Sequence, residues 1–292
     1  MSKAPGGSLR GPFCSSPYFL PPESPLWYIP AVKPKIDALI LKVSGNTIEG
    51  VVDEVAAELP VRLVLNGEAL VTLLCTPADL EELAVGFLLS EGLLQDRSSL
   101  IKLTRSDAGP SIDIEIAGLP EGWEKQFEKR TISSGCGKGI TFTNYDRSKD
   151  RKIDTKGPLM TVSAIRAQLI KFRDISKLYL ETGGVHSAAL SDGKDLLFFS
   201  EDIGRHNAVD KLIGKAFLKG ISIENKVLFT SGRVTSEIVT KAGRNRFPIV
   251  VSRAAASCMA ISYAEDMGIT LVGFARGERM NIYTWPNRIK LA

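Results

Sequence analysis

The apolar residues in the first half of the chain fall in short runs that are typical of β-strands. Six such runs follow one another, at residues 36–43, 48–52, 61–65, 69–74, 100–104 and 111–116. Asn66-Gly67-Glu68 separates the third run from the fourth. An Asn-Gly pair in this position indicates a β-hairpin, because both residues accept the backbone conformation of a tight turn. We therefore expect a sheet in this half.

One helix is expected among these strands. Its apolar positions recur at intervals of three and four residues: Leu80, Leu83, Ala84, Phe87 and Leu88. Thr76 is a suitable N-cap, Pro77 suits the first helical position, and Asp79 completes a capping box. Gly92 is placed to end the helix. Cys75 closes the preceding strand, where we expect a core residue. The first half is therefore predicted to be α+β.

In the second half, predicted strands alternate with single helices. We expect helices at 162–172, 206–219, 236–245 and 257–267, and strands at 185–190, 196–200, 226–230, 248–251 and 269–274. This alternation is typical of an α/β domain whose sheet is covered by helices on both faces. Cys258 begins an apolar helix with Ala260, Ile261 and Ala264, so we expect its side chain to be buried.

The composition along the chain predicts three regions. Residues 1–35 hold eight of the fifteen prolines, which indicates a flexible Pro-rich arm. Residues 36–157 form the N-terminal α+β domain, and residues 158–292 form the C-terminal α/β domain. The boundary lies in the segment 145–158, where charged residues of both signs gather as in a solvated connector.

The overall composition argues against several function classes. The chain has 37 basic and 33 acidic residues and a net charge of +4, which is too mild for a nucleic-acid-binding protein. No run approaches the roughly eighteen apolar residues of a membrane span, and the N-terminus has no apolar export signal. The four cysteines are far apart, which argues against a disulfide framework. We therefore expect a cytoplasmic protein without a membrane or nucleic-acid partner.

The sequence gives no support for a metal site. No second histidine lies three or four residues from His186 or His206, and Cys-x-x-Cys does not occur, so we expect no protein-bound zinc or other metal. A zinc hydrolase of the deaminase type needs such a cluster of ligands. Serine-hydrolase chemistry is also unsupported, because there is no G-x-S-x-G motif.

One cysteine has unusual neighbours. Cys136 lies within Ser133-Ser134-Gly135-Cys136-Gly137-Lys138-Gly139. Three glycines in five residues argue against a helix or a strand and predict a mobile loop. Lys138 beside a partly exposed thiol favours the thiolate, which is the nucleophilic form of cysteine. This loop is therefore either a plain turn or the site of a reactive thiol, with Cys136 as the candidate catalytic residue.

Arginine follows four successive strands that are predicted in the second half. The segments concerned are Gly204-Arg205, Ser231-Gly232-Arg233, Ser252-Arg253 and Arg276-Gly277-Glu278-Arg279. Ligands of such a sheet gather beyond the carboxyl ends of its strands, at helix N-termini. The planar guanidinium group suits phosphate, and glycine lets a ligand approach the backbone closely. The pattern predicts a site for an anionic ligand with phosphate groups, as in a nucleotide.

The two histidines of the chain have different expected roles. His206 follows Arg205 at the start of a predicted helix and is a candidate ligand contact. His186 begins a strand. There it is either a ligand contact or a hydrogen-bonded core residue, and the sequence leaves both readings open.

The block from Glu201 to Lys211, EDIGRHNAVDK, resembles the hallmark of the FdhD family of formate dehydrogenase accessory sulfurtransferases. Other segments are similar to that family as well: Thr182-Gly183-Gly184-Val185-His186, Ser231-Gly232-Arg233, Ser252-Arg253 and Phe274 to Arg279. The resemblance extends from about Ile36 to the C-terminus.

This resemblance implies a protein that takes sulfur from a cysteine desulfurase as a persulfide. The sulfur then passes to the molybdenum cofactor, Mo-bis(molybdopterin guanine dinucleotide), before the cofactor enters apo-formate dehydrogenase. The resemblance assigns the persulfide to Cys136 and cofactor binding to Phe274, Ala275, Arg276, Gly277, Glu278 and Arg279. It also implies a cytidine-deaminase-like, three-layer C-terminal domain and a cytoplasmic homodimer.

The chain departs from the family in one respect. Many members carry two cysteines in this loop as Cys-x-x-Cys, whereas this chain has Cys136 alone. A single persulfide on Cys136 is then the simpler hypothesis. The alternative is a molybdenum-cofactor-binding chaperone, in which the arginine sites carry the function and no sulfur is transferred covalently.

Overall fold

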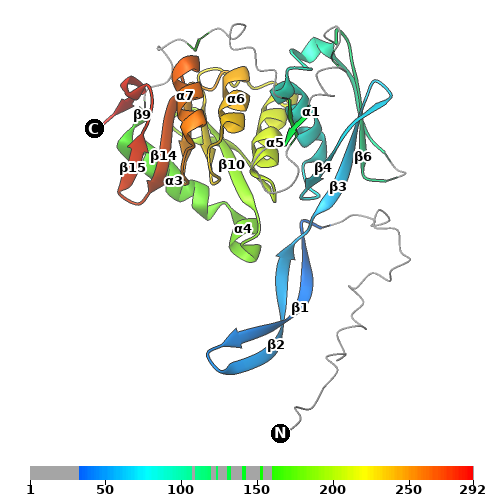
Figure 1. Ribbon diagram of the computed structural model, residues 1–292, viewed down its shortest axis with the longest axis vertical. Coiled ribbons are helices and arrows are strands. Elements are labelled where there is room, and N and C mark those ends of the chain that lie inside the picture. Colours follow the sequence, from blue (N-terminus) through cyan, green and yellow to red (C-terminus); the bar gives the residue numbers. More distant parts are fainter. Residues whose placement is uncertain are drawn as a thin grey trace, which may run out of the picture.

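A computed structural model describes residues 33–106, 109–119, 123, 130–132, 140–142, 152–153 and 160–291. Cys136 and almost all of the predicted arm at residues 1–35 lie outside these ranges. The described chain forms a body of two adjoining parts and a two-stranded ribbon that projects from it (Figure 1).

The first part of the body is a four-stranded sheet packed on helix α1 (Leu80–Glu91). Its strands are β3 (Leu59–Leu65), β4 (Glu68–Cys75), β5 (Leu100–Arg105) and β6 (Ser111–Ile116), in the order β4-β3-β6-β5. Leu65 pairs with Glu68, which confirms the predicted hairpin. Val61, Leu63 and Leu65 are fully buried against the helix, because alternate residues of a strand face the same side.

Helix α1 begins three residues later than the sequence predicted. Its N-cap is Asp79, which has φ +52° and makes no side-chain capping hydrogen bond, so the predicted capping box is wrong. The hydroxyl of Thr76 instead accepts a hydrogen bond from the backbone N–H of Ile203, at 3.0 Å. Gly92 ends the helix with φ +76°, as predicted.

The second part is a six-stranded mixed sheet in the order β11-β10-β12-β13-β14-β15. Its strands are β10 (His186–Ser191), β11 (Leu196–Asp202), β12 (Val227–Thr230), β13 (Ile249–Ser252), β14 (Thr270–Arg276) and β15 (Arg279–Ile282). β12, β13 and β14 are parallel, and β10 is antiparallel to both of its neighbours. β11, β12, β13 and β14 therefore end at one edge of the sheet, and β10 begins there.

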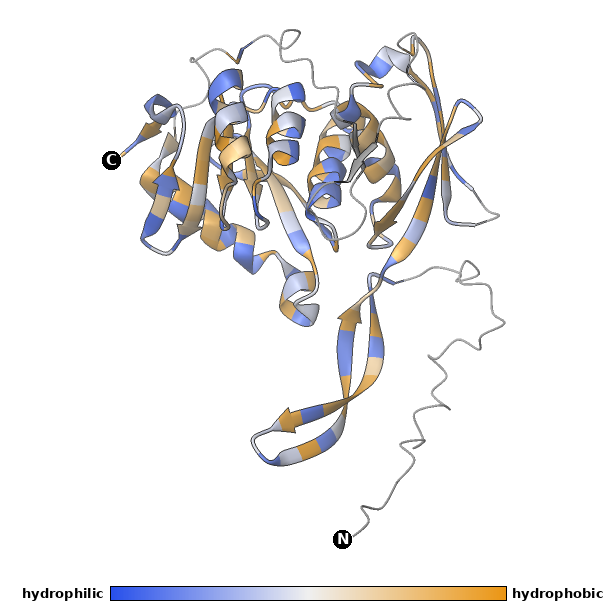
Figure 2. Ribbon diagram, in the orientation of Figure 1, coloured by the Kyte–Doolittle hydropathy of each residue, from blue (hydrophilic) through white to orange (hydrophobic). Residues whose placement is uncertain are grey.

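Helices cover both faces of this sheet, as the alternation of elements predicted. α5 (Arg205–Leu218), α6 (Ser236–Arg244) and α7 (Cys258–Met267) pack on one face, and α3 (Val162–Asp174) packs on the other. Every residue of β12 and β13 is buried, because both of their faces are covered. Figure 2 shows α5, α6 and α7 as mixed in hydropathy.

Several short elements complete the described chain. α4 (Lys177–Thr182) precedes β10, and β9 (Met160–Thr161) pairs with β16 (Ile289–Lys290). β7 (Arg130–Ile132) pairs antiparallel with β8 (Ile140–Phe142). Two 3₁₀ turns occupy residues 97–99 and 286–288.

The two parts of the body meet at a close crossing of α1 and α5, which lie side by side in Figure 1. A Cβ atom on Gly86 of α1 would lie 1.8 Å from the backbone oxygen of Asp210, and one on Gly214 of α5 would lie 1.9 Å from that of Glu82. Backbone therefore packs directly on backbone, and only glycine fits at these two positions.

Buried charges pair beside this crossing. Lys241 of α6 donates at 2.8 Å to each carboxylate oxygen of Asp210, and its Nζ atom lies 3.6 Å from Glu91 at the end of α1. Burial raises the pKa of Glu91, and the charge of Lys241 opposes that rise. Removing one partner of such a group leaves an uncompensated buried charge, so the cluster favours one arrangement of the three helices.

The projecting ribbon consists of β1 (Lys35–Ser44) and β2 (Thr47–Ala56). Paired residues of two neighbouring strands share a face. Leu39 pairs with Val52, and Val43 pairs with Ile48; all four side chains are more than half exposed. The ribbon thus presents an apolar face to solvent.

The base of the ribbon contacts α4. Lys35 of β1 forms ion pairs with Glu54 of β2 at 2.6 Å and with Glu181 of α4 at 3.0 Å. A Cβ atom on Gly184, just beyond α4, would lie 3.2 Å from the Cβ atom of Ala56. The ribbon is therefore anchored at the segment that leads into β10.

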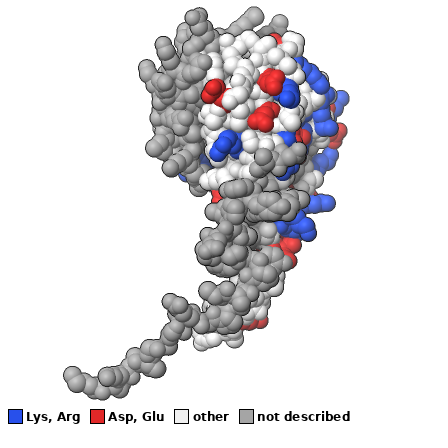
Figure 3. All heavy atoms as spheres, turned by 90° about the vertical axis from the view of Figure 1, so that its right-hand side faces the viewer, with Lys and Arg blue, Asp and Glu red and all other residues white. Residues whose placement is uncertain are grey.

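The face of the body shown in Figure 3 carries charges of both signs. On the end of the body that faces the viewer in Figure 3, basic and acidic side chains are interspersed among uncharged ones.

Within the described residues, no helix has the length and apolar character needed to span a membrane.

We predict that Gly86→Ala lowers the free energy of unfolding by about 3 kcal/mol, because its Cβ atom would displace the backbone of α5. Urea unfolding followed by circular dichroism measures the change. Gly50→Ala is the matched control, because a Cβ atom there has nothing within 4 Å. Equal unfolding midpoints for the two variants would contradict the close crossing.

Candidate functional site

The edge of the large sheet at which β11 to β14 end and β10 begins holds a cavity of about 360 Å³. Its lining residues are Ser176, Tyr179, Gly183, Gly184, Val185, His186, Ser187, Ser231, Arg253 and Arg276. Of the residues predicted to bind the ligand, Ser231, Arg253 and Arg276 lie in this lining. The predicted convergence of strand ends is thus confirmed for β12, β13 and β14.

The cavity lining is cationic. It includes Arg253 and Arg276 and no Asp or Glu among the residues that the structure describes. The Nε atom of Arg276 donates to the backbone oxygen of Arg253 at 2.6 Å, which holds the two arginines together. Guanidinium groups without a neighbouring carboxylate are suited to phosphate, so the lining favours an anionic ligand.

His186 also lines the cavity, which favours the ligand-contact role among the two that the sequence left open. Its Nδ1 atom lies 3.5 Å from the hydroxyl of Ser231. Burial lowers the pKa of His186, and the positive charges of Arg205 and Arg233 lower it further. The imidazole is therefore neutral near pH 7.

Arg205 and Gly232 lie behind His186 and do not line the cavity themselves. Arg205 is buried, with 5% of its surface exposed. A Cβ atom on Gly232 would lie 2.9 Å from the Cβ atom of Arg205 and 3.4 Å from Nδ1 of His186. Glycine at this position therefore lets the arginine pack beside the histidine.

His206 lies outside the cavity lining as well. Its Nε2 atom is 2.8 Å from a carboxylate oxygen of Glu237, at the start of α6. Arg233 is exposed and acts on His186 through its charge. The structure thus brings His206 and Arg233 close to the cavity without placing them in its lining.

The segment from Phe274 to Arg279 divides between the cavity and the exposed turn that follows β14. A register shift between Gly273 and Arg276 accompanies a strained Phe274, which has φ +51°. Such irregularities in strands recur next to functional sites, where they redirect a side chain. Arg276 lines the cavity, whereas Glu278 pairs with Arg166 of α3 at 2.8 Å.

The other members of this segment have different roles. Ala275 is buried in the core beneath the sheet, and Gly277 forms the turn with φ +52°. The guanidinium group of Arg279 lies 5.3 Å from the centre of the Phe274 ring, within cation–π range. Arg276 is therefore the one residue of Phe274–Arg279 that lines the described cavity.

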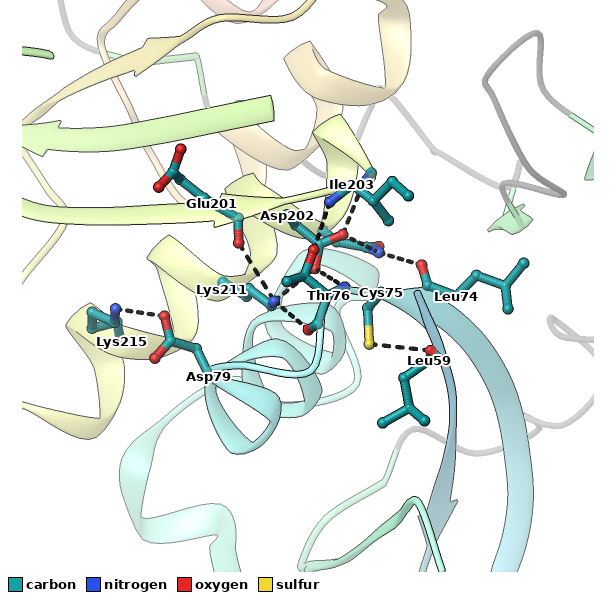
Figure 4. A network of polar contacts seen from close by, with 12 residues as sticks. Leu59, Leu74, Cys75, Thr76, Asp79, Glu201, Asp202, Ile203, Lys211 and Lys215 are labelled. Atoms are coloured by element: carbon teal, nitrogen blue, oxygen red, sulfur yellow. Dashed lines mark hydrogen bonds and ion pairs between the residues drawn. The ribbon is translucent and has the colours of Figure 1, made fainter. Parts of the chain in front are cut away.

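Much of the block from Glu201 to Lys211 joins the two parts of the body (Figure 4). Nζ of Lys211 lies 2.6 Å from Asp202 and donates to the backbone oxygen of Thr76 at 2.9 Å. Asp202 in turn accepts from the backbone N–H of Thr76 at 3.0 Å. Both charged side chains are completely buried. Burial raises the pKa of Asp202, and Lys211 opposes that rise.

Glu201 holds α4 in place beside the cavity. Its carboxylate accepts hydrogen bonds from the backbone N–H groups of Leu178 and Tyr179, at 3.1 and 3.0 Å. These bonds fix α4, which supplies Tyr179 to the lining. Burial raises the pKa of Glu201, and the two backbone N–H groups oppose that rise.

Reasoning from the sequence missed part of the lining: Ser176, Tyr179, Gly183, Gly184, Val185 and Ser187. These residues come from α4 and from the start of β10, where a strand begins instead of ending. Two signals in the sequence pointed to this region: the pair Gly183-Gly184, because adjacent glycines mark a turn, and the similarity of the segment from Thr182 to His186 to the FdhD family.

The cysteines differ in environment. Cys75 is buried as predicted, and burial raises the pKa of its thiol to about 12. Cys258 is exposed, so the prediction of a core residue is wrong. It occupies the first position of α7, whose apolar face consists of later residues such as Ala260 and Ala264. Cys136 lies outside the described residues.

The described residues contain no group of three or more His, Cys, Asp or Glu side chains arranged to hold a metal ion. Arginine, serine and histidine dominate the polar lining instead. The fold and this lining define the class: a two-part α/β protein with a cationic ligand cavity at the edge of its larger sheet.

Comparison with known proteins identifies the family. The model of the FdhD/NarQ family matches residues 56–290, and this chain belongs to that family. It is 37% identical to the sulfur carrier protein FdhD of Bacillus subtilis (strain 168), over 86% of this chain and 96% of that protein. It is 41% identical to the sulfur carrier protein FdhD of Wolinella succinogenes, over 82% of this chain and 83% of that protein.

A solved structure shares the fold. It is the crystal structure of a "putative formate dehydrogenase accessory protein" from Desulfotalea psychrophila. The two chains are 26% identical, with a TM-score of 0.72, and the match covers 88% of this chain and 99% of that one.

We predict that Lys211→Met lowers the free energy of unfolding by about 3–5 kcal/mol, because it leaves Asp202 charged and unpaired in a buried site. The double variant Asp202→Asn/Lys211→Met should recover part of that loss. Lys171→Met is the control, because its ion pair with Asp195 is largely exposed and is expected to contribute less than about 1 kcal/mol. Urea denaturation compares all three. An equal loss in Lys211→Met and Lys171→Met would contradict the role of the buried pair.

Proposed function

We propose that this protein is a sulfur carrier that accepts sulfur as a persulfide on Cys136 and transfers it to Mo-bis(molybdopterin guanine dinucleotide). The cationic cavity carries the proposal, because it offers a place for the diphosphate of that cofactor in a chain whose relatives are named sulfur carriers. In the first step, the Cys136 thiolate attacks the outer sulfur of a persulfide on a cysteine desulfurase. The desulfurase leaves as a thiolate, and Cys136 becomes the persulfide.

The cavity residues fit a phosphate-bearing ligand. Arg253 and Arg276 would hold the diphosphate, and the backbone at Gly183 and Gly184 leaves room beside it. The cavity volume of about 360 Å³ is near the lower end for ligand sites, so it suits one nucleotide-sized part of the cofactor. Four further predicted residues lie outside the lining and would act on the ligand indirectly. The contribution would be electrostatic for Arg205, His206 and Arg233, and steric for Gly232.

The strands on either side of Cys136 support its role. β7 ends at Ile132, β8 begins at Ile140, and these two residues pair with each other. The two ends of the segment that carries Cys136 are therefore held side by side. A glycine-rich segment between such ends is suited to present a thiol to a protein partner.

The other parts of the proposal come from the family resemblance. They are a cysteine desulfurase as the donor, apo-formate dehydrogenase as the client, a cytoplasmic homodimer and a cytidine-deaminase-like C-terminal domain, which would follow the boundary near residues 157 and 158 that the charged composition of residues 145–158 predicts. The crossover from β12 through α6 to β13, and then through α7 to β14, supports the last of these. The exposed apolar face of the ribbon supports a protein partner.

Incubation with a cysteine desulfurase and cysteine is expected to add one sulfur atom to the peptide that contains Cys136. Peptide mass spectrometry measures this gain, and a reductant should reverse it. Cys136→Ser should abolish the gain, whereas Cys258→Ser is the matched control because it removes an exposed thiol elsewhere in the chain. A sulfur found on Cys258 alone, or on no cysteine, would rule out the persulfide on Cys136. Cofactor binding without added sulfur would favour the chaperone alternative.

Arg253→Ala and Arg276→Ala are each expected to weaken the binding of guanosine diphosphate by roughly tenfold or more, since each removes a charge-assisted contact. Isothermal titration calorimetry measures the affinity. Arg105→Ala on β5 is the control, because it removes an exposed arginine outside the cavity. An equal effect of all three variants would refute the cavity as the binding site.

A further inference from the structure

His186 lies between two groups of positive charges. Arg253 and Arg276 share the cavity lining with it. The positive charges of Arg205 and Arg233 also act on it. An anion that enters the cavity would therefore approach a histidine that is surrounded by cations.

The nearby carboxylates already have other partners. Asp202, which pairs with His186 across β10 and β11, binds Lys211 and the backbone of Thr76. Glu201 binds the backbone of α4. Glu237 lies against His206. Within the part of the chain that the structure describes, no carboxylate lines the cavity to stabilise a protonated His186.

Ser231 allows His186 to change its protonation state. The hydroxyl oxygen of Ser231 lies 3.5 Å from Nδ1 of His186 and accepts a hydrogen bond from the backbone N–H of Ser187 at 2.9 Å. The hydroxyl hydrogen can donate to Nδ1 of the neutral ring, and the hydroxyl can rotate to accept from Nδ1–H of the protonated ring. Nε2 keeps a hydrogen for the ligand in both states.

A ligand would change the balance of charge at this histidine. Burial and the surrounding cations keep the free imidazole neutral by lowering its pKa. A phosphate diester brings negative charge into the same space, which favours the imidazolium.

We propose that His186 is the proton-coupled contact of this cavity: it takes up one proton from solvent when a diphosphate diester binds, and it donates a hydrogen bond from Nε2 to a phosphate oxygen. The choice of a diphosphate diester rests on the proposed function. Arg253 and Arg276 supply attraction at every pH, and His186 supplies attraction that depends on pH.

The direction of the pH dependence follows from the sign of the linkage. Binding raises the pKa of His186, so the added affinity is complete below the pKa of the free protein. It is lost as pH rises through the pKa of the complex. Between these two values, the affinity falls by up to about tenfold per pH unit, the limit for one linked proton.

The test uses P1,P2-di(guanosine-5′) pyrophosphate, which lacks the terminal phosphate group that titrates near pH 6. Isothermal titration calorimetry from about pH 6 to pH 8, in buffers of different ionisation enthalpy, gives the affinity and the number of protons taken up. We expect affinity to be at least about tenfold higher at the acidic end, with net proton uptake.

His186→Asn is expected to remove most of the pH dependence, whereas Arg105→Ala, which removes an exposed arginine outside the cavity, is expected to keep it. The chain has two histidines, so the imidazole Cε1–H region of an untagged protein contains two resonances. The probe should move that of His186 toward the imidazolium position, and this measurement on the unaltered chain does not depend on whether a variant folds.

Binding without proton uptake, or an unchanged pH dependence in His186→Asn, would overturn this inference and leave the cavity assignment intact. Failure of the probe to bind at any pH would overturn both the inference and the binding part of the proposed function. The persulfide on Cys136 is tested separately by mass spectrometry.

Discussion

The contact of α1 with α5 determines where the first sheet lies relative to the cavity. Gly86 and Gly214 let the two helix backbones meet, and Lys211 fills the buried space at the start of α1 by binding Asp202 and Thr76. α5 also begins with Arg205, which packs behind His186. One helix, α5, therefore both joins the two parts of the body and supports the cavity. A change in the contact between α1 and α5 is expected to alter the binding site as well.

The cavity owes its character to strand direction. β10 runs against its neighbours, and so it brings His186 to the edge where β13 and β14 deliver Arg253 and Arg276. The carboxylates of this region already have partners: Asp202 binds Lys211 and the backbone of Thr76, Glu201 binds the backbone of α4, and Glu237 lies against His206. The lining thus stays positive although the chain as a whole is nearly balanced in charge. Local arrangement decides which ion the protein can hold.

The sequence predicted the features that depend on local pattern: the hairpin at Asn66-Gly67, the alternating helices and strands, and the arginines at strand ends. Prediction from the sequence failed where the hydrogen-bond partners of a residue are distant in the chain. The capping role of Thr76 was wrong because Asp202, Ile203 and Lys211, more than 120 residues away, use its polar groups. Within Glu201–Lys211, no local pattern distinguishes the residues that join the two parts of the body from those that support the binding site. The apolar periodicity after Cys258 did not reveal that Cys258, at the start of α7, is exposed to solvent.

The ribbon of β1 and β2 is attached to the body only near its base, among the residues that the structure describes. Its ten-residue strands extend into solvent, and its base is fixed to α4 through Lys35 and Glu181 and lies against Gly184 on the cavity rim. Val43 lies near the tip of the ribbon, whereas the contacts that hold the ribbon to α4 lie at its base. A protein bound to the ribbon would therefore be connected, through Lys35 and Ala56, to the segment that supplies Tyr179 and His186.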